Sequence, residues 1–553
     1  MVGWERWRNA GLLASALWLW HFVLSGMPTV VAQEPAGVPQ PRTRAEASDY
    51  QQTSSHADVL EFLDELQRRS AQIRVETLAT SVAGRAVPLV VVASPEVGGP
   101  IAARREGRVV VYVQANIHGG EVEGKEVALR LLRDVTLGSR RALLTRLVLL
   151  VAPIYNADGN DAWGPASELR SEQQGPDPIG LRANGQGLDL NRDCMKAVSP
   201  EMRGALAAVF NAWDPDVVFD LHTTNGTRHH YSLTYAPPLT PNTDTDVMAL
   251  VREELLPTVG ARLRELRSLE TFVYGDMDRV ENPTRWVSFS PEPRYVTNYV
   301  GARNRIGILS EATSYRPFRE RVAATWEFVD ACLAFIYENA ARIADTTRRA
   351  DQRVCAWGLA PESAPPLGIR FAEFSRGREV VRWEGIPSGG AASPDPARVV
   401  ETEVEVCDRF QATRTARLPR AYWVGTGQHE VVELLRRHGV RVERLLGDAQ
   451  LVAERFRVAE IDVAERPFQG HRLTRLEGRW ENGSLEVAAG SYLVRTAQPL
   501  ALLAFHLLEP ESLDGVAAWG LLDRFLAVDQ LYPLAKIYDP ISVPTRVVSS
   551  TPE

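Results

Sequence analysis

The sequence predicts an α/β protein with a mostly parallel mixed sheet flanked by helices, followed by a smaller β-rich C-terminal domain. Two observations support this fold class. Across residues 50–347, short apolar runs alternate with longer amphipathic segments, which is the pattern of a sheet covered by helices. Across residues 348–553, strand-like runs follow one another with turns between them. The chain of 553 residues also exceeds the roughly 250–300 residues at which single cores stop growing.

Five apolar runs are the expected strands of the sheet. They are rich in Val, Leu and Ile and contain few polar residues, as expected for strands covered on both faces. In chain order they are Pro88–Ala93, Val109–Gln114, Leu147–Ala152, Val217–Leu221 and Ile306–Leu309. The expected helices, from their periodicity, are Val122–Thr136, Val247–Leu266 and Arg319–Arg342.

The C-terminal domain is expected to consist mainly of strands. Val380–Trp383, Val399–Val406 and Leu473–Val487 carry the strand pattern, and one helix-like segment, Glu430–His438, ends at Gly439. A glycine at that position is typical of a helix C-terminus. No motif with recognisable chemistry falls in this domain, so the sequence assigns it no function.

The first 32 residues have the layout of a secretory signal peptide. Two arginines precede an apolar run from Ala10 to Met27, Pro28 breaks the run, and Val30-Val31-Ala32 offers a cleavage site. This layout predicts cleavage after Ala32, a linker over residues 33–49, and a secreted or periplasmic protein. The alternative is an uncleaved anchor, but the run is short against the roughly 20 residues that a membrane span needs. We therefore expect no stable membrane insertion after signal cleavage.

Charge and cysteine content bear on possible partners and on the redox state. The net charge of −8 and the pI of about 5.8 argue against a nucleic-acid partner, which requires clustered basic charge. The four cysteines, Cys194, Cys332, Cys355 and Cys407, have no metal-knuckle spacing. Export permits disulfides, and of the three possible pairings we prefer Cys355–Cys407, because both residues lie in the C-terminal domain. The alternative is four buried free thiols.

The first candidate site is the turn after the run Val109–Gln114. His118-Gly119-Gly120-Glu121 lies between that strand and a helix expected to begin near Val122, and ligands of α/β sheets collect beyond the carboxyl ends of strands. The glycines remove Cβ atoms that would keep the imidazole and the carboxylate from converging. The alternative is a surface turn whose glutamate favours a helix start. Glu123 and Glu126 are rival ligands, but both are expected inside the helix.

A second apolar strand ends in a histidine, His222. Two histidines and one glutamate at strand ends form a His₂Glu set, which is a known catalytic zinc set with its fourth position open. His229 and His230 are alternative ligands, but they follow in the loop after the strand. The sequence therefore favours one zinc ion per chain, held by His118, Glu121 and His222.

Two further motifs place charged groups near these strand ends. Asp189-Leu190-Asn191-Arg192 sets an arginine beside an asparagine, and Arg182 lies upstream in the same loop. Such an arginine can grip a carboxylate through charge-assisted contacts; the alternative for each arginine is a surface ion pair of little energetic value. Glu311 ends a third apolar strand, where a carboxylate near a metal can act as general base and then as acid. Its alternative is a helix-start carboxylate.

Together these motifs resemble the zinc carboxypeptidases of the carboxypeptidase A type, from about Gly84-Arg85 to about Arg321. The resemblance implies a carboxypeptidase-like fold for residues 50–347. By the same resemblance, His118, Glu121 and His222 bind the zinc ion, Glu311 is the catalytic glutamate, Arg182 polarises the scissile carbonyl, Asn191 and Arg192 hold the terminal carboxylate of the substrate, and Asp189 orients His118.

Two features of this family have no clear match. For the mobile tyrosine that caps the substrate we select Tyr299, with Tyr295 as the alternative. No residue can be assigned to the base of the specificity pocket, so the preferred C-terminal side chain stays open. The C-terminal domain lies outside the resemblance.

The resemblance implies an exported metallocarboxypeptidase, which releases the C-terminal residue of peptides by means of a metal-activated water and Glu311 as general base. Zinc deacylases acting on N-acyl amino acids are the first alternative, because the segments around Glu121 and His222 suit them as well. Cell-wall peptides would also suit an exported enzyme. A non-catalytic binding module is the second alternative, since a fold alone does not establish activity, but the presence of all the ligands and of Glu311 argues against it.

Overall fold

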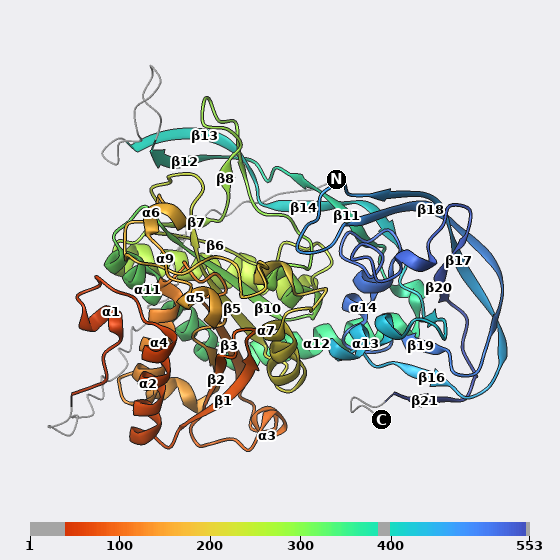
Figure 1. Cartoon of the computed structure of the whole chain (residues 1–553), viewed down its shortest axis with the longest axis horizontal. Helices are drawn as coiled ribbons and strands as arrows, with labels where there is room; N and C mark the ends of the chain where they lie inside the picture. The colour runs from red at the N-terminus through yellow and green to blue at the C-terminus, as the bar shows by residue number, and fades with distance from the viewer. Residues whose placement is uncertain (1–38, 385–398, 549–553) are drawn as a thin grey trace, which may run out of the picture. The chain divides into compact units, whose positions relative to one another are not determined.

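The computed structural model describes residues 39–384 and 399–548 (Figure 1). The expected signal peptide, residues 1–32, and the start of the expected linker lie outside these residues. Among the residues that the structure describes, no helix is long and apolar enough to cross a lipid bilayer. The described residues from Gln40 onward belong to one compact unit.

The central sheet has eight strands in the order β1-β2-β4-β3-β5-β10-β6-β7. The bounds of its strands, in that order, are Ile73–Thr80, Ala86–Val92, Leu147–Ala152, Val109–Ala115, Val217–Thr224, Ile306–Thr313, Leu233–Ala236 and Thr271–Val273. Strand β3 is parallel to β4 and β5, and β5 is parallel to β10. The pairs β1–β2, β2–β4 and β10–β6 are antiparallel. The predicted α/β class with a mixed sheet is confirmed.

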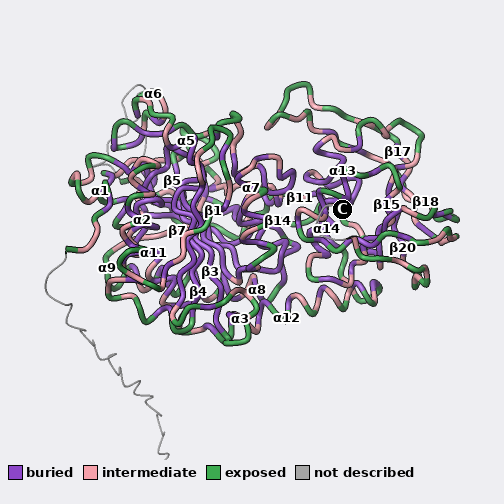
Figure 2. Tube along the Cα trace, turned by 60° about the horizontal axis from the view of Figure 1, so that its bottom comes forward, coloured by how far each residue is buried: buried purple, intermediate pink, exposed green. Residues whose placement is uncertain are grey.

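The four inner strands form the centre of the core. Every residue of β3, β4, β5 and β10 is buried, and the burial colouring of Figure 2 shows a buried interior around β3 and β4. Their Val, Leu and Ile side chains remove apolar surface from water, which stabilises the sheet by roughly 25 cal/mol per Å². All five predicted strands are present. Strands β1, β6 and β7 were not predicted. Strands β6 and β7 have only four and three residues, too few for a periodicity to be read from the sequence. Strand β1 lies at the edge of the sheet and has only two buried residues, so it lacks an apolar run.

Helices flank this sheet. Helix α11 (Phe318–Glu338) packs against α4 (Glu123–Thr136), α9 (Leu256–Arg267) and strand β10. Figure 1 shows α4 and α11 on one side of the inner strands and α12 (Ala340–Leu359) on the other. Helix α10 (Val296–Ala302) packs against β5 and β10, the two strands that carry His222 and Glu311.

The C-terminal domain is β-rich, as predicted. A seven-stranded sheet has the order β18-β17-β20-β15-β19-β16-β21, with bounds Thr474–Val487, Ala449–Val463, Leu531–Ile537, Ala421–Val424, Tyr492–Arg495, Glu443–Leu445 and Thr545–Val547. Helices α13 (His429–Arg437) and α14 (Ala501–Leu508) belong to the same region. Strands β11 (Leu367–Phe374) and β14 (Arg409–Ala416) form a separate pair.

The chain passes between the two expected domains without a break in structure. Helix α12 (Ala340–Leu359) runs through residues 347 and 348, where the boundary was expected. A four-stranded sheet also combines β8 (Asp276–Met277) and β9 (Arg285–Val287) with β12 (Arg378–Glu384) and β13 (Val399–Cys407). The division into residues 50–347 and 348–553 stays a prediction, and the two regions share both a helix and a sheet.

The preferred disulfide is absent. All four cysteines lie within the described residues and are free, so the Cys355–Cys407 pairing is wrong. Cys355 lies on helix α12, whereas Cys407 ends strand β13 and its Sγ lies 3.3 Å from Nη2 of Arg285. The alternative of free thiols describes the structure, with Cys194 and Cys332 packed in the core.

A buried ion pair joins helix α11 to the start of helix α4. Nε of Arg321 donates to Oε1 of Glu123 at 2.6 Å, and both side chains are fully buried, at 0% exposure. Arg321 also donates to the carbonyls of Gln174, Gly175 and Arg316 at 2.6–3.0 Å. These contacts hold helix α11 against the start of helix α4 and against the loop that contains residues 174 and 175.

Arg321→Met is expected to lower the free energy of unfolding by about 3–5 kcal/mol, because it leaves the Glu123 carboxylate buried without a counter-charge. Urea denaturation measures this loss. The matched control Arg342→Met removes a half-exposed arginine that pairs with Glu254, and its expected cost is at most about 1 kcal/mol. Equal losses in the two variants would contradict the role assigned to the buried pair.

Candidate metal centre

The turn after strand β3 places the first two candidate ligands. Asn116 has a left-handed backbone with φ of 59°, and its side-chain amide donates to the carbonyls of His118, Gly119 and Glu121 at 3.1–3.3 Å. A Cβ on Gly119 would lie 2.2 Å from the backbone carbon of Gly159, so only glycine fits at this position. The turn therefore points the side chains of His118 and Glu121 toward the same space.

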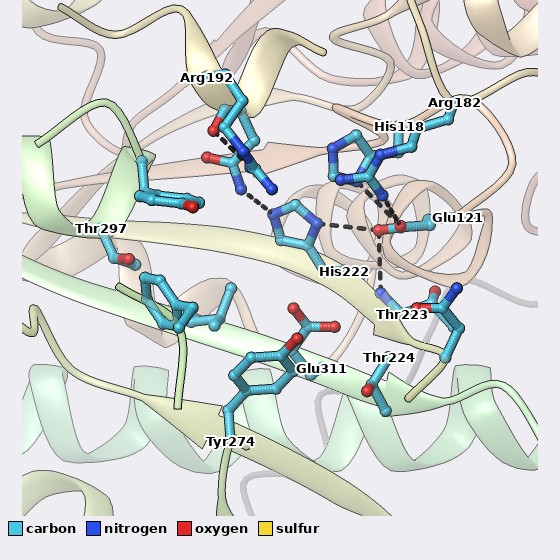
Figure 3. Close-up of a pocket in the computed structure, with 15 residues that line it drawn as sticks. His118, Glu121, Arg182, Arg192, His222, Thr223, Thr224, Tyr274, Thr297 and Glu311 are labelled. Atoms are coloured by element: carbon cyan, nitrogen blue, oxygen red, sulfur yellow. Dashed lines mark hydrogen bonds and ion pairs between the residues drawn. The ribbon is translucent and has the colours of Figure 1, made fainter. Parts of the chain in front are cut away.

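His118, Glu121 and His222 converge near the carboxyl ends of β3 and β5 (Figure 3). Nδ1 of His118 lies 3.0 Å from Oε1 of Glu121, and Nδ1 of His222 lies 2.9 Å from Oε2 of the same carboxylate. One ligand atom from each residue falls within 4.8 Å of the others. Each side chain is only 3% exposed. These three residues can therefore reach a single cation.

Two aspartates determine which ring nitrogens face the centre. Oδ1 of Asp189 lies 3.0 Å from Nε2 of His118, and Oδ2 of Asp220 lies 2.8 Å from Nε2 of His222. Because a carboxylate only accepts, Nε2–H of His118 donates to Asp189, and its Nδ1 is left to face the candidate metal position. At His222 the Asp220 carboxylate makes an ion-pair contact with the ring, and Nδ1 lies on the side of Glu121. The Asp189 contact was anticipated from the sequence, whereas Asp220 was given no role. Its position two residues before His222, on the same face of the strand, is the signal that could have found it.

The donor set fits a zinc ion. Nδ1 of His118 is buried and makes no hydrogen bond among the described residues beyond its 3.0 Å contact with the Glu121 carboxylate, as expected of two atoms arranged around one metal position. Two imidazoles and one carboxylate form a catalytic zinc set with the fourth position open to water or substrate. The orienting carboxylates behind both rings are also typical of zinc centres.

The charges around the centre keep its acidic ligand ionised. Burial alone would raise the pKa of Glu121, but the positive charges of His118 and Arg170 hold it well below the usual range. Burial likewise lowers the pKa of His222, but Asp220 and Glu121 raise it well above the usual value. A metal held by His222 would have to displace a proton from this imidazole, so metal affinity should weaken as the pH falls.

Glu311 lies on β10, in register with His222 on the adjacent strand β5. Its side chain is buried, and Figure 3 shows its carboxyl group in the pocket beside Tyr274. Burial, with the negative charges of Glu121 and Asp220 nearby, raises the pKa of Glu311 to about 8. A carboxyl group with so high a pKa is a stronger base than an exposed glutamate.

The predicted arginines and Asn191 surround the same space. Arg182 lies 3.2 Å from Oε1 of Glu121 and 2.8 Å from Oδ2 of Asp189. The guanidinium of Arg192 stacks on the ring of Tyr295 at 4.3 Å. Nδ2 of Asn191 lies 3.3 Å from Nε2 of His222. These residues leave positive charge and amide groups at one end of the pocket.

A further arginine was missed by the sequence reasoning. Arg170 is buried, and its guanidinium lies 3.1 Å from Oε1 of Glu121 and donates to the carbonyl of Thr223 at 3.0 Å. It follows the short helix α6 (Ala166–Leu169), outside any recognisable motif. The sequence therefore carried no signal for its position beside the centre.

The side chains enclose a cavity of about 370 Å³. Seven of its lining residues carry the predicted chemistry, and the remaining lining residues among those described have no formal charge. The full lining is His118, Glu121, Arg182, Asn191, Arg192, His222, Thr223, Thr224, Asn225, Tyr274, Phe289, Tyr295, Thr297, Leu309 and Glu311.

Comparison with known proteins identifies the family. Residues 59–233 match the family model of the zinc carboxypeptidases. This segment of the chain is a zinc carboxypeptidase domain. It is a metallocarboxypeptidase, a peptide hydrolase of a zinc-dependent family, as the sequence motifs predicted. The matched segment contains all three candidate ligands of the carboxypeptidase but ends before Glu311.

Relatives of the carboxypeptidase match much more of the chain than the family model does. Carboxypeptidase 2 of Trichophyton tonsurans is 22% identical over 450 residues, which cover 77% of this chain and 76% of that protein. Among solved structures, a metallo-carboxypeptidase from Burkholderia cenocepacia has 17% identity and a TM-score of 0.37, with 52% of this chain and 70% of that chain covered. Carboxypeptidase A from Helicoverpa armigera has 16% identity and a TM-score of 0.38, with 55% and 76% covered.

Tyr299, selected from the sequence as the tyrosine that caps the substrate, lies outside the pocket of the carboxypeptidase. Its ring has 0% exposure, and its hydroxyl is 2.9 Å from Nδ1 of His438 and accepts from Arg303 at 3.1 Å. Helix α10 turns this side chain into the core, so the structure does not bring Tyr299 to the cavity. Tyr295, the alternative, lines the cavity, and so does Tyr274, which the sequence reasoning missed.

The rival ligands lie outside the candidate metal cluster of the carboxypeptidase. Glu123 pairs with Arg321, and Glu126 accepts from the hydroxyl groups of Thr53 and Ser54. His229 packs against the rings of Tyr231 and Trp286. The backbone N–H of His230 donates to the carbonyl of Arg382. Among the described residues, only His118, Glu121 and His222 form a cluster that could hold a metal ion.

Proposed function

We propose that this carboxypeptidase is exported and removes the C-terminal residue of peptides at a single zinc ion held by His118, Glu121 and His222. The convergence of one ligand atom from each of these three buried side chains within 4.8 Å carries the proposal. A bound zinc ion would supply Lewis acidity to the attacking water and to the scissile carbonyl. The export proposal rests on the signal-like residues 1–32, and N-terminal sequencing of the mature protein should find Gln33.

Glu311 is the general base of the proposed reaction. Its carboxylate takes a proton from the attacking water and later delivers a proton to the leaving amine. The pocket position and the raised pKa of about 8 support this role, because a proton acceptor works best with a pKa near the operating pH. Arg182 faces the same space and stabilises the negative charge that develops on the carbonyl oxygen.

Asn191 and Arg192 bind the terminal carboxylate of the peptide. Stacking on Tyr295 fixes the plane of the Arg192 guanidinium, and Nη1 is held by the carbonyl of Asn191 at 2.8 Å. A guanidinium held in this way presents its remaining N–H groups to a carboxylate with little loss of conformational freedom. This arrangement distinguishes a carboxypeptidase from an enzyme that cleaves within a chain.

A panel of substrates tests the proposal. Zinc-loaded enzyme should release the last residue from peptides with a free C-terminus and leave the same peptides with a C-terminal amide uncleaved. Arg192→Met is expected to lower kcat/KM for the free peptides by about 10–100-fold, because it removes a charged hydrogen bond to the carboxylate. The exposed Arg279 provides the control, and Arg279→Met should retain wild-type kcat/KM.

The same panel separates the alternatives. Equal cleavage of amidated peptides would remove Arg192 from its proposed role. Preferential hydrolysis of N-acyl amino acids would instead identify a deacylase, and binding without turnover would identify a non-catalytic module. Cell-wall peptides with a free C-terminus belong in the panel, because they share the chemistry that the pocket recognises.

A further inference from the structure

The C-terminal domain reaches the candidate site through residues 468–471, which we call the Gln469 turn. The backbone N–H groups of Phe468 and His471 each donate to the carbonyl of the other, at 2.7 and 3.0 Å. Gln469 and Gly470 have φ of 52° and 82°. Two successive left-handed residues between paired backbones form a tight turn of fixed shape. The Gln469 side chain therefore projects from a defined position.

Gln469 holds the backbone of Asp189. Its Oε1 accepts a hydrogen bond from the N–H of Asp189 at 2.8 Å. The carboxylate of Asp189 in turn accepts from the N–H of Asn191 at 2.9 Å and contacts His118 and Arg182 at 3.0 and 2.8 Å. Asp189 also precedes the short helix η2 (Leu190–Arg192). A displacement of the Asp189 backbone would therefore move the turn that carries Asn191 and Arg192.

A second contact joins the C-terminal domain to the segment before Tyr295. Asp514 is buried; its Oδ2 accepts from the N–H of Arg294 at 2.8 Å, and its Oδ1 lies 2.8 Å from Nε of the same arginine. The Arg294 guanidinium lies over the rings of Phe468 and Trp519, at 5.4 and 5.2 Å. Since Phe468 belongs to the Gln469 turn, the two contacts form one assembly.

Arg294 leads directly into residues that touch the proposed carboxylate-binding pair. The ring of Tyr295 stacks on the Arg192 guanidinium at 4.3 Å. The N–H of Val296 donates to Oδ1 of Asn191 at 3.0 Å. The C-terminal domain thus supports the pair from two sides, through Asp189 at one end and through Arg294 at the other.

We propose that Gln469 and Asp514 are positioning residues for the terminal carboxylate of the substrate, and that the C-terminal domain is part of the catalytic unit. This inference rests on the proposed function of Asn191 and Arg192. Groups that grip a ligand must be held within about 0.5 Å of their productive geometry by the residues behind them. The two contacts provide that support from beyond residues 59–233, the segment that the family model matches.

Steady-state kinetics of the full-length, zinc-loaded enzyme test the inference. Gln469→Met keeps the side-chain length but removes the acceptor, and Gln469→Asn keeps an acceptor that is too short to reach Asp189. Each is expected to raise KM for a free-carboxylate peptide by about 3–10-fold, as for one lost hydrogen bond, with kcat within about twofold. Inhibition by the released amino acid should weaken by the same factor. Gln469→Glu, which retains an acceptor of full length, should restore the KM.

Asp514→Asn should raise KM in the same way, because it weakens the hold on Arg294. The matched control is Gln450→Met on strand β17, an exposed position, where KM should not change. An unchanged KM and unchanged product inhibition in the Gln469 variants would overturn the inference. So would a fall in thermal stability or in kcat alone, because a purely structural support has no reason to act on carboxylate binding.

The inference and the proposed function fail in different ways. A wild-type enzyme that cleaves amidated and free peptides equally would contradict the role of Arg192 itself. A wild-type enzyme that requires the free carboxylate, with Gln469 variants that bind it normally, would contradict only the role of the C-terminal domain. If Gln469→Met does not fold, Gln469→Asn must still show the rise in KM, since asparagine tolerates the left-handed backbone of the turn.

Discussion

Glu311→Gln is expected to lower kcat on a free-carboxylate peptide by about 10²–10⁴-fold, which is the usual contribution of a general base. The amide preserves the size of the side chain on β10 but cannot accept the proton of the attacking water. Because the residue is not assigned to substrate binding or to the metal, KM and zinc content should stay close to wild type. Single-turnover measurements at saturating substrate isolate this step from product release.

The pH dependence of kcat provides an independent test of the role of Glu311. Burial raises the pKa of Glu311 to about 8, so the proton-accepting carboxylate is gained as the pH rises and lost as it falls. A bound zinc ion favours the ionised form, so in the loaded enzyme this limb of the profile should lie below pH 8. Glu311→Gln should lack the limb, whereas the exposed Glu281→Gln should keep both limb and rate. A Glu311→Gln enzyme with wild-type kcat would exclude the proposed mechanism.

Much of the metal centre could be anticipated because its signals are local. The apolar runs of β3, β5 and β10 identify strands, and the glycines after His118 identify a turn that lets two side chains converge. The carboxyl ends of parallel strands lie at the same edge of a sheet. Residues at the ends of different strands could therefore be predicted to lie close together. Glu311, which lies outside the matched family segment, was selected in this way, and its side chain lines the same cavity as the candidate ligands.

The tyrosine that lines the cavity could not be predicted, because its direction depends on where the short helix α10 begins. Tyr295 and Tyr299 stand four residues apart, and the structure begins helix α10 at Val296. Tyr295 precedes the helix with an extended backbone and lines the cavity, whereas Tyr299 is inside it and faces His438. A shift of the helix start by one residue would have altered which ring enters the cavity. Sequence patterns place helix ends only to within a few residues.

Contacts between segments far apart in the sequence could not be predicted either. Arg170 touches Glu121 from a loop with no motif, and Gln469 meets Asp189 across 280 residues of chain. Such pairs are specified by the packing of the whole unit rather than by a local period. They explain why the sequence reasoning assigned no chemistry to the C-terminal domain, although that domain contacts the backbone of a residue that orients a proposed zinc ligand.

His222→Asn is expected to remove zinc and activity together. Changing even the partner behind a zinc ligand costs about 10–100-fold in affinity, so loss of the ligand should cost more than about 100-fold. Asp220→Asn leaves the imidazole in place but removes a charge that orients it. This variant should lose about 10–100-fold in zinc affinity. Metal analysis after dialysis and competition with a chelating dye measure both effects.

Rescue by added zinc separates the two variants and tests the whole assignment of the centre. Activity of Asp220→Asn should return at high zinc concentration, because all three ligands remain, whereas His222→Asn should stay inactive. The rival histidine provides the control, and His230→Asn should keep its zinc at wild-type affinity. Zinc retained by His222→Asn but lost from His230→Asn would move the centre into the loop after β5. The sequence favoured His222 over His230 as the ligand, and the 2.9 Å contact between His222 and Glu121 supports the strand residue.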